Sequence, residues 1–302
     1  MQKIRRALIL GLVSLSATLA QEPNPETFVV RSDVNVIVLH ATVQDRDGGF
    51  ISGLDQSAFK ISEDGAPQQI TVFSSEDVPV AVGLVIDNSG SMTRRRADVI
   101  TGALTFIKER KPEDEIFVVS FRDTAELALP ADRPFSADAV ELRTALMKGE
   151  VGGQTALYDG IALALNHLDK AKLRKKVLLV VSDGADNRSR AKLEDVVKMA
   201  DRAGVLMYTI GLFDEHSEDR NPGVLRRLAK QTGGLAYMPK DLKEVSTICS
   251  QIARDIRNQY TVGYSSSKAS ADTAFHQVKL TAVDKRGRQL QVRSRTGFYG
   301  VK

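Results

Sequence analysis

Hydrophobic and polar residues alternate in the first part of the chain, over about residues 28–75. In "VNVIVLHATVQD" the apolar side chains of Val34, Val36 and Val38 fall on one parity. Such alternation predicts strands with one buried and one exposed face. The segments "DRDGGF" and "EDG" predict hairpin turns, because glycine accepts the positive φ that tight hairpins require. We interpret this region as the strands of a β-sandwich.

The pattern changes over about residues 79–257. Four runs there are apolar without alternation, as expected of strands buried on both faces: "VAVGLVID", "EIFVVSF", "KVLLVVSD" and "GVLMYTIGL". Between them lie segments of helical periodicity, such as "RADVITGALTFIKER", which places Val99, Leu104, Phe106 and Ile107 on roughly one side. Repeated alternation of strand and helix predicts an α/β fold with a doubly wound, mostly parallel sheet.

A second region of alternation follows the last predicted helix. That helix covers about residues 241–257 and has one apolar stripe, which includes Cys249. From Tyr260 onward, "YTVGYSS", "HQVKLTAVD" and "QLQVRSRTGFY" again predict strands. The two flanking β-strand segments either pair into one small β-sandwich with the α/β domain inserted, or form two separate β units. The pattern leaves both arrangements open.

The N-terminus has the features of an export signal. Lys3, Arg5 and Arg6 precede the apolar run "ALILGLVSLSATLA", and Thr18 and Ala20 stand at the −3 and −1 positions of a cleavage site. This combination predicts a secretory signal peptide, with an uncleaved anchor as the alternative. We therefore expect a secreted or periplasmic protein. The predicted parts are the signal peptide over 1–20, an N-terminal β segment over 21–78, the α/β domain over 79–257 and a C-terminal β segment over 258–302.

Charge and cysteine content narrow the function classes. The 302 residues include 42 Lys and Arg against 38 Asp and Glu, and three of the cations lie within residues 1–20. Removal of that segment leaves a net charge of +1, so we expect no nucleic-acid partner. Cys249 is the single cysteine, which excludes an intrachain disulfide. No later segment is long and apolar enough to span a bilayer, so we expect no membrane span after removal of the signal peptide.

Oxygen-bearing side chains follow the predicted buried strands. In a parallel α/β sheet, sites form where strands deliver their carboxyl ends. Gly90 permits a tight turn in the first of these segments. Carboxylates and hydroxyls are hard donors that suit Mg²⁺, Mn²⁺ or Ca²⁺ and not zinc. The candidate ligands are Asp87, Ser89 and Ser91 in "DNSGS", Thr155 in "GGQTALYDG" and Asp183 in "VVSDGADN".

Three of these motifs in this order, D-x-S-x-S, the threonine of "GGQTALYDG" and "SDG", resemble the metal-ion-dependent adhesion site (MIDAS) of the von Willebrand factor type A (vWA) family. The resemblance covers about 180 residues and includes the order of strands and helices. Taken alone, Asp87 to Ser91 is equally compatible with an N-cap and helix start. The flanks and the tail "RTGFYG" look like the ends of bacterial exported VWFA-related proteins. The resemblance implies a vWA, Rossmann-like sheet.

The resemblance also implies roles for the five residues. The hydroxyls of Ser89 and Ser91 contact the metal directly, Thr155 does so directly or through water, and Asp87 and Asp183 act through water. The family leaves one coordination position open for a carboxylate of a protein partner. Two aspartates just neutralise a divalent cation, which therefore still attracts a further anion. We expect Mg²⁺, or Mn²⁺ or Ca²⁺, and a partner that offers an acidic side chain.

Residues near the motifs have simpler interpretations. Asp186 and Asn187 are expected to shape the loop after Asp183, and Asp159 to be an exposed or capping residue. The run Arg94 to Arg96 is interpreted as a solvated first helical turn rather than a contact for an acidic partner. "RKK" at 174–176 is interpreted as the polar edge before a buried strand. "DRDGG" does not predict a calcium loop, because Gln56 stands where such a loop requires Glu.

The sequence does not favour catalysis. None of the four histidines lies in a site motif, and the chain has no G-x-S-x-G and no Walker A motif. We therefore expect no enzyme, and a hydrolase is the least favoured function. The leading hypothesis is an exported, adhesion-type module that binds an acidic residue of a partner through the metal. The alternative is an envelope assembly or scaffold protein with a structural metal. A further hypothesis is that ligand binding displaces the helix over 241–257 and so reaches the C-terminal β segment.

Overall fold

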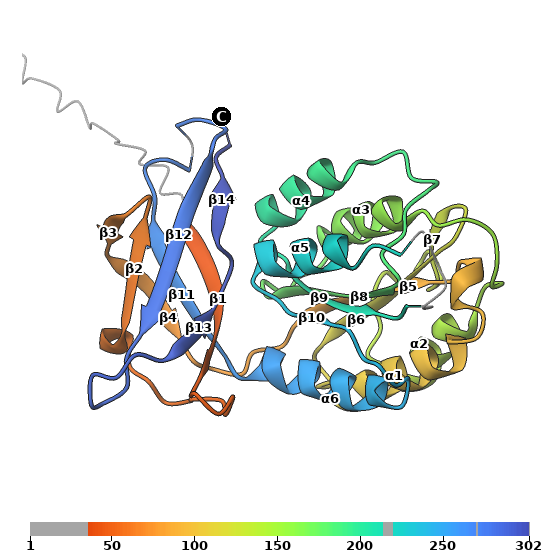
Figure 1. Ribbon diagram of the computed structural model, residues 1–302, viewed down its shortest axis with the longest axis horizontal. Coiled ribbons are helices and arrows are strands. Elements are labelled where there is room, and N and C mark those ends of the chain that lie inside the picture. Colours follow the sequence, from red (N-terminus) through yellow and green to blue (C-terminus); the bar gives the residue numbers. More distant parts are fainter. Residues whose placement is uncertain (1–35, 214–219, 270, 302) are drawn as a thin grey trace, which may run out of the picture. The chain divides into compact units, whose positions relative to one another are not determined.

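The computed structural model describes residues 36–213, 220–269 and 271–301. The predicted signal peptide over 1–20 lies outside these residues. Strands and helices of the described chain form a six-stranded mixed sheet with helices, and two further four-stranded sheets (Figure 1). No helix within the described ranges is long and apolar enough to cross a membrane.

The six-stranded sheet has the order β10-β9-β8-β5-β6-β7. Its strands pair in parallel except β7, which is antiparallel to β6. The central strands β5 and β8 are buried almost throughout, which explains their continuous apolar sequences. The predicted α/β fold with a doubly wound, mostly parallel sheet is confirmed. The strands are β5 (Ala81–Asp87), β6 (Glu115–Phe121), β7 (Ala125–Leu127), β8 (Lys176–Ser182), β9 (Leu206–Gly211) and β10 (Ala236–Tyr237).

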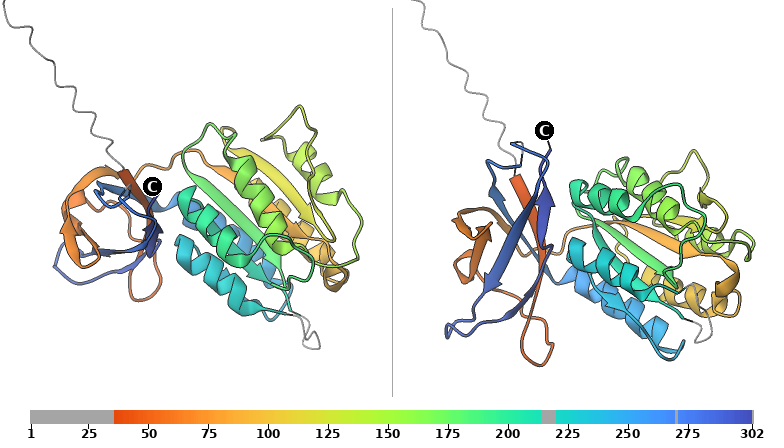
Figure 2. Two further views of the ribbon diagram at one scale, coloured as in Figure 1. Left: turned by 90° about the horizontal axis from the view of Figure 1, so that it is seen from above. Right: turned by 45° about the horizontal axis from the view of Figure 1, so that its top comes forward.

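Helices cover both faces of this sheet (Figure 2). α3, α4 and α5 lie on one face, and α1 and α6 pack against each other on the opposite face. Local sequence fixes the helix ends: α5 begins at Pro222 after the capping side chain of Asn221 and ends at Gly233 with a φ of 86°. The helices are α1 (Arg96–Lys108), α2 (Ala139–Met147), α3 (Leu157–Leu168), α4 (Leu193–Arg202), α5 (Pro222–Thr232) and α6 (Glu244–Arg257).

The two flanks of the chain pair with each other. One sheet has the order β13-β1-β11-β4 and the other the order β14-β12-β2-β3, so each contains strands from both flanks. Their inner faces share one core, in which Leu39, Val262, Ile61 and Leu280 are buried. Of the two arrangements left open by the sequence, the structure has the single β-sandwich. Its strands are β1 (Val36–Gln44), β2 (Phe59–Glu63), β3 (Ala66–Gln68), β4 (Ile70–Ser74), β11 (Gln259–Ser265), β12 (Phe275–Ala282), β13 (Gln291–Arg293) and β14 (Gly297–Tyr299).

A buried carboxylate joins α6 to the β-sandwich. Asp255 on α6 accepts hydrogen bonds from the hydroxyl of Thr42 on β1 (2.7 Å) and from the hydroxyl of Tyr208 on β9 (2.8 Å). The guanidinium of Arg293 on β13 pairs with the same carboxylate. A buried charge is tolerated when a counter-charge and hydrogen bonds satisfy it, as they do here. α6 is therefore fixed at its C-terminal end by contacts with three strands.

We predict that Asp255→Ala lowers the free energy of unfolding by about 3–5 kcal/mol, because it leaves the largely buried Arg293 without its counter-charge. The measurement is urea unfolding followed by circular dichroism. Glu194→Ala is the matched control, since it breaks an exposed ion pair with Arg227 (3.0 Å) and should change stability far less. Equal losses in both variants would contradict the prediction.

A second prediction concerns acid stability. Burial, and then the nearby cations of Lys175 and Arg295, lower the pKa of His40 from 6.5 to about 3. Below pH 6.5 the unfolded chain therefore binds a proton that the folded chain does not bind, and stability falls as the pH decreases. This one group contributes a slope of at most about 1.4 kcal/mol per pH unit. Unfolding free energies at several pH values should show a shallower acid slope for His40→Asn, and an unchanged slope would refute the assignment.

Candidate metal centre

The pairing of β5 with β8 places two carboxylates at the same edge of the sheet. Asp87 is the last residue of β5 and Asp183 directly follows β8, whose register pairs Ile86 with Val181. Both carboxylate residues are only 2% exposed. The hydroxyl of Ser182 donates to Oδ2 of Asp87 at 2.6 Å. The strand ends therefore hold two buried negative groups close together.

The loop after β5 brings the first motif together. Oδ1 of Asp87 accepts the backbone N–H of Ser89 at 2.9 Å, which turns the loop back over the strand end. The hydroxyl oxygens of Ser89 and Ser91 lie 3.2 Å apart. A short 3₁₀ helix, Gly90–Met92, follows and leads toward α1. Three of the five predicted ligands thus lie close together in this loop.

Backbone hydrogen bonds tie the Thr155 loop to the loops after β5 and β8. The N–H of Thr155 donates to Oδ1 of Asn187 (2.9 Å), and its carbonyl accepts from the N–H of Asn187 (3.0 Å) and of Arg188 (3.1 Å). On the other side, the N–H of Gly90 donates to the carbonyl of Gly153 (3.3 Å). The structure therefore holds side by side the three segments that carry the predicted ligands.

The electrostatics of the site fit a divalent cation. The pKa of Asp87 is raised from 3.8 to about 6, mainly by burial and to a smaller extent by the neighbouring carboxylate of Asp183, against hydrogen bonds from Ser182 and Ser89 that lower it. Two buried carboxylates are costly without a counter-charge. Together with the hydroxyls of Ser89, Ser91 and Thr155 they make a set of hard oxygen donors. The residues present fit Mg²⁺ or a similar ion, and the five remain predicted ligands.

Several supporting residues were not predicted as site components. Ser182 orients Asp87, and the side chain of Asn88 accepts a hydrogen bond from Arg96. The interpretation of Arg96 as solvated is wrong, because its guanidinium is half-buried and also donates to the carbonyls of Met147, Lys148 and Gly149 at 3.3 Å each. The sequence signal was the arginine run itself, which does not reveal what it contacts.

The expected role of Asp186 agrees with the structure, whereas Asp159 is half-buried and is not the exposed or capping residue that was expected. Oδ1 of Asp186 accepts from the N–H of Tyr158 (3.2 Å) and the hydroxyl of Ser189 (2.6 Å), which shapes the loop as expected. The carboxylate of Asp159 accepts hydrogen bonds from the N–H groups of Arg190 and Ala191 and so holds the loop that precedes α4. Both acids are engaged with backbone, which supports their exclusion from the ligand set.

The glycines that the site needs are not the one singled out from the sequence. Gly90 lies outside the left-handed region, whereas Gly152, Gly153 and Gly184 have φ values of 141°, 78° and 79°. A Cβ on Gly153 would clash with the carboxylate of Asp123, and a Cβ on Gly184 would clash with the carbonyl of Asn221. The positions that require glycine therefore lie in the loops that carry Thr155 and Asp183.

The family of the domain follows from comparison with known proteins. The family model of the von Willebrand factor type A domain matches residues 82–185, a range that contains all five predicted ligands. The chain contains a vWA domain. A von Willebrand factor type A protein from Catenulispora acidiphila is similar, with 16% identity and a TM-score of 0.54 over 81% of this chain and 73% of that one.

Two further vWA structures show the same fold. The vWF domain of the type V pili tip protein Mfa5 from Porphyromonas gingivalis has 13% identity and a TM-score of 0.51, over 60% of this chain and 95% of that one. Proximal thread matrix protein 1 of the mussel byssus, with a zinc-occupied MIDAS motif, has 17% identity and a TM-score of 0.52, over 63% and 48% of the two chains. At these identities the likeness shows the fold alone.

Two curated relatives each match a little more than half of the chain. An uncharacterised protein of Borreliella burgdorferi is 26% identical over 185 residues, which are 55% of this chain and 52% of the relative. An uncharacterised protein of Synechocystis is 25% identical over 177 residues, which are 56% of this chain and 40% of the relative. The chain thus spans about half the length, or less, of the curated relatives that it matches.

The glycine geometry of the vWA site gives a prediction. Gly153→Ala should destabilise the protein by about 1–3 kcal/mol, because alanine is strained at positive φ and its methyl group meets Asp123. Gly90→Ala is the matched control: its Cβ would make only an ordinary contact of 3.5 Å with the carbonyl of Gly153. Thermal unfolding should separate the two variants, and a Gly90 variant as unstable as the Gly153 variant would contradict the analysis.

Proposed function

We propose that the protein is an exported binding module that holds an acidic side chain of a protein partner through a divalent ion at the vWA site. The observation that supports the proposal is that two buried carboxylates and the hydroxyl residues Ser89, Ser91 and Thr155 lie on three loops that backbone hydrogen bonds fasten together. Mg²⁺ is the expected ion, with Mn²⁺ and Ca²⁺ as alternatives. A bound ion would supply an open coordination position with residual positive charge.

The charges of the predicted ligands decide what the open coordination position of the ion can bind. Asp87 and Asp183 together balance the charge of a dication but do not exceed it, so a further anion remains attractive. A site with three or four carboxylates would lose this attraction. Because the donors are held by backbone contacts, they are in place before a ligand arrives, which reduces the ordering cost of binding.

The histidines support a binding role over a catalytic one. His40 and His276 lie on strands of the β-sandwich. His167 is buried between Phe117 and Phe135, and its Nε2 pairs with the carbonyl of Pro134 at 2.7 Å. Among the described residues, no histidine makes a hydrogen bond to a predicted ligand. A general base of the usual kind is thus lacking from the described part of the site, and we propose that the protein is not an enzyme.

The neighbours in fold are consistent with this proposal. Mfa5 is a pilus tip protein, and the mussel thread matrix protein has a MIDAS motif occupied by zinc. Zinc therefore belongs in any test of ion preference here, although the hard donor set favours magnesium. The signal peptide expected over residues 1–20 supports export.

Metal binding tests the proposal directly. Isothermal titration of the purified chain with Mg²⁺, Mn²⁺ and Ca²⁺ should show uptake at one site that Asp183→Ala abolishes. With Zn²⁺, the same variant should lose the share of the uptake that belongs to this site. Asp195→Ala, which removes an exposed aspartate of α4, is the control and should bind as the wild type does. No uptake of any of these ions by the wild type at the vWA site would overturn the proposal.

Partner binding is the second readout. Capture of envelope proteins by the immobilised chain should require the metal, disappear with EDTA or Asp87→Ala, and be competed by acidic peptides but not by their amide counterparts. The alternative, a scaffold protein with a structural metal, predicts instead that EDTA lowers the melting temperature strongly and leaves partner binding to the folded fraction unchanged.

A further inference from the structure

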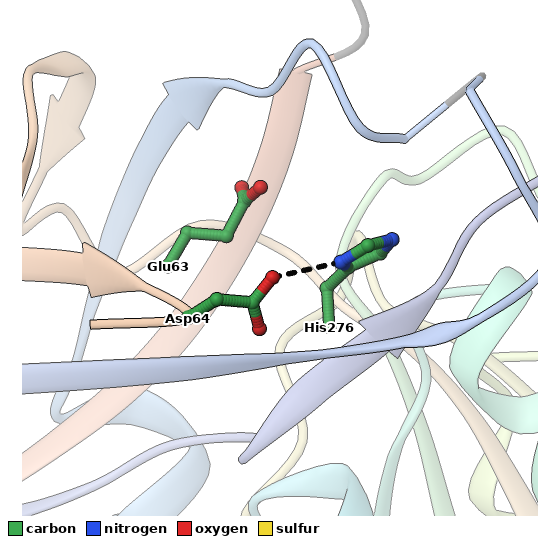
Figure 3. Close-up of side chains that lie close together, drawn as sticks. All are labelled: Glu63, Asp64 and His276. Carbon is green, nitrogen blue, oxygen red and sulfur yellow. Dashed lines mark hydrogen bonds and ion pairs between the residues drawn. The ribbon is translucent and has the colours of Figure 1, made fainter. Parts of the chain in front are cut away.

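A second group of potential metal ligands lies in the β-sandwich, at the turn that joins β2 to β3 (Figure 3). Glu63 ends β2, Asp64 lies in the turn and His276 lies on β12. One ligand atom from each of the three side chains lies within 4.8 Å of the others. The carboxylate of Asp64 faces the imidazole ring of His276, and the carboxylate of Glu63 stands beside both. The group is independent of the vWA site.

The turn holds Asp64 in an unusual conformation. Asp64 has a φ of 48°, the only positive value of a non-glycine residue in the described ranges, and Gly65 follows with 84°. Two positive φ values in a two-residue hairpin are typical of a type I′ turn, for which Asp-Gly is favoured. Oδ1 of Asp64 accepts the N–H of Gln277 at 2.8 Å. This contact leaves Oδ2 of Asp64 directed at Nδ1 of His276, at 2.9 Å.

Glu63 supplies a buried carboxylate that has no ion-pair partner within 4.0 Å among the described residues. Strand alternation sends its side chain into the sandwich together with Phe59 and Ile61, and the residue is only 2% exposed. Its Oε2 has no hydrogen-bond partner of good geometry among the described residues. The carboxylate lies near the hydroxyl of Tyr264 on the facing sheet, and this closeness contributes to the raised pKa of Tyr264, whose main cause is burial. A buried carboxylate without a partner is unfavourable unless a cation compensates it. The side chain is therefore suited to receive a cation at this point.

The imidazole of His276 is oriented as in many metal sites. Its ring packs on Phe298, with the ring centroids 5.2 Å apart. Its Nε2 pairs with Oδ1 of Asp272 at 3.1 Å. A carboxylate on the outer ring nitrogen fixes the tautomer and leaves the other nitrogen available to a metal. Here that other nitrogen is Nδ1, which faces Asp64.

We propose that Glu63, Asp64 and His276 bind a divalent transition-metal ion such as Zn²⁺, with Asp272 as the positioning residue for the imidazole. One nitrogen and two carboxylate oxygens are a donor set that zinc accepts. Ligands of one tetrahedral zinc ion with bonds of about 2.0 Å lie roughly 3.3 Å apart, close to the observed separation of Nδ1 and Oδ2. Three protein ligands leave a fourth position for water.

Lys268 competes with the metal in this arrangement. Its Nζ lies 2.6 Å from Oδ2 of Asp64, the same oxygen that the metal would use. The side chain of Lys268 is 45% exposed, so it has room to move into solvent. Binding of the metal and the Lys268 to Asp64 ion pair therefore exclude each other. Removal of the Lys268 ammonium should therefore strengthen metal binding, whereas a cluster with a purely structural role would bind no metal in either case.

Imidazole NMR tests the site in the intact chain. Zinc is titrated into the ¹⁵N-labelled protein while long-range ¹H–¹⁵N spectra follow the histidine rings. The vWA site has no predicted histidine ligand, so zinc there leaves the rings unaffected and failure of one proposal is separable from failure of the other. We expect the Nδ1 signal of His276 to shift and to saturate with zinc, and the signals of His40 and His167 to stay unchanged. An unperturbed His276 at millimolar zinc overturns the proposal.

Matched variants sharpen the test. Asp272→Asn should weaken zinc binding roughly 10–100-fold, and the isosteric Glu63→Gln by at least as much. Lys268→Met should strengthen it, because the competing ammonium is removed. In an Asp183→Ala background, which removes binding at the vWA site, zinc should raise the melting temperature of the chain with an intact Glu63 and that of Lys268→Met but not that of Glu63→Gln. Zinc affinity that is unchanged in both Lys268→Met and Glu63→Gln overturns the assignment, whatever the stability of the variants.

Discussion

The parallel pairing of β5 with β8 is the constraint on which the vWA site depends. These strands are buried on both faces, so their register is fixed by the packing of the sheet and not by the loops. That register brings Asp87 beside Ser182 and next to the start of the Asp183 loop. Two carboxylates are thereby buried close together, which raises the pKa of Asp87. The cost of this burial is what favours a cation at the strand ends.

The loops add hydroxyl residues to the two carboxylates and so complete the set of predicted oxygen ligands. Each loop is fastened by hydrogen bonds from its backbone to a neighbouring loop, through Asn88, Gly153 and Asn187. Asn88 and Gly153 accept through their backbone carbonyls, and Asn187 accepts through Oδ1 of its side chain. These bonds hold side by side the three segments that carry the predicted ligands Ser89, Ser91 and Thr155. The β-sandwich uses a comparable device, since Asp272 supports the ring of His276.

Much of this architecture could be predicted from sequence because its signals are local. Continuous apolar runs identified β5, β6, β8 and β9, and the motif order identified the five candidate ligands. The contacts that support the site could not be predicted in this way. Arg96 reaches carbonyls about fifty residues away, and Ser182 was visible only as part of a motif. The pairing of β1 with β11 joins residues more than two hundred positions apart, and period-two alternation does not specify a partner strand. Glu63 also escaped notice, because a glutamate at the end of a strand gives no sign that it is buried.

The point at which the vWA domain enters and leaves the β-sandwich has a mechanical meaning. β4 and β11 are antiparallel neighbours, and Ser74, where the chain leaves the sandwich, is opposite Thr261, just after the chain returns. The α/β domain is thus closed at its base like the loop of a very large hairpin. Tension applied to the chain on either side of the sandwich would be carried by the ladders between its strands, and the inserted domain would be sheltered from the load while those ladders hold. A domain inserted in this way can keep the geometry of its site while the protein is under shear.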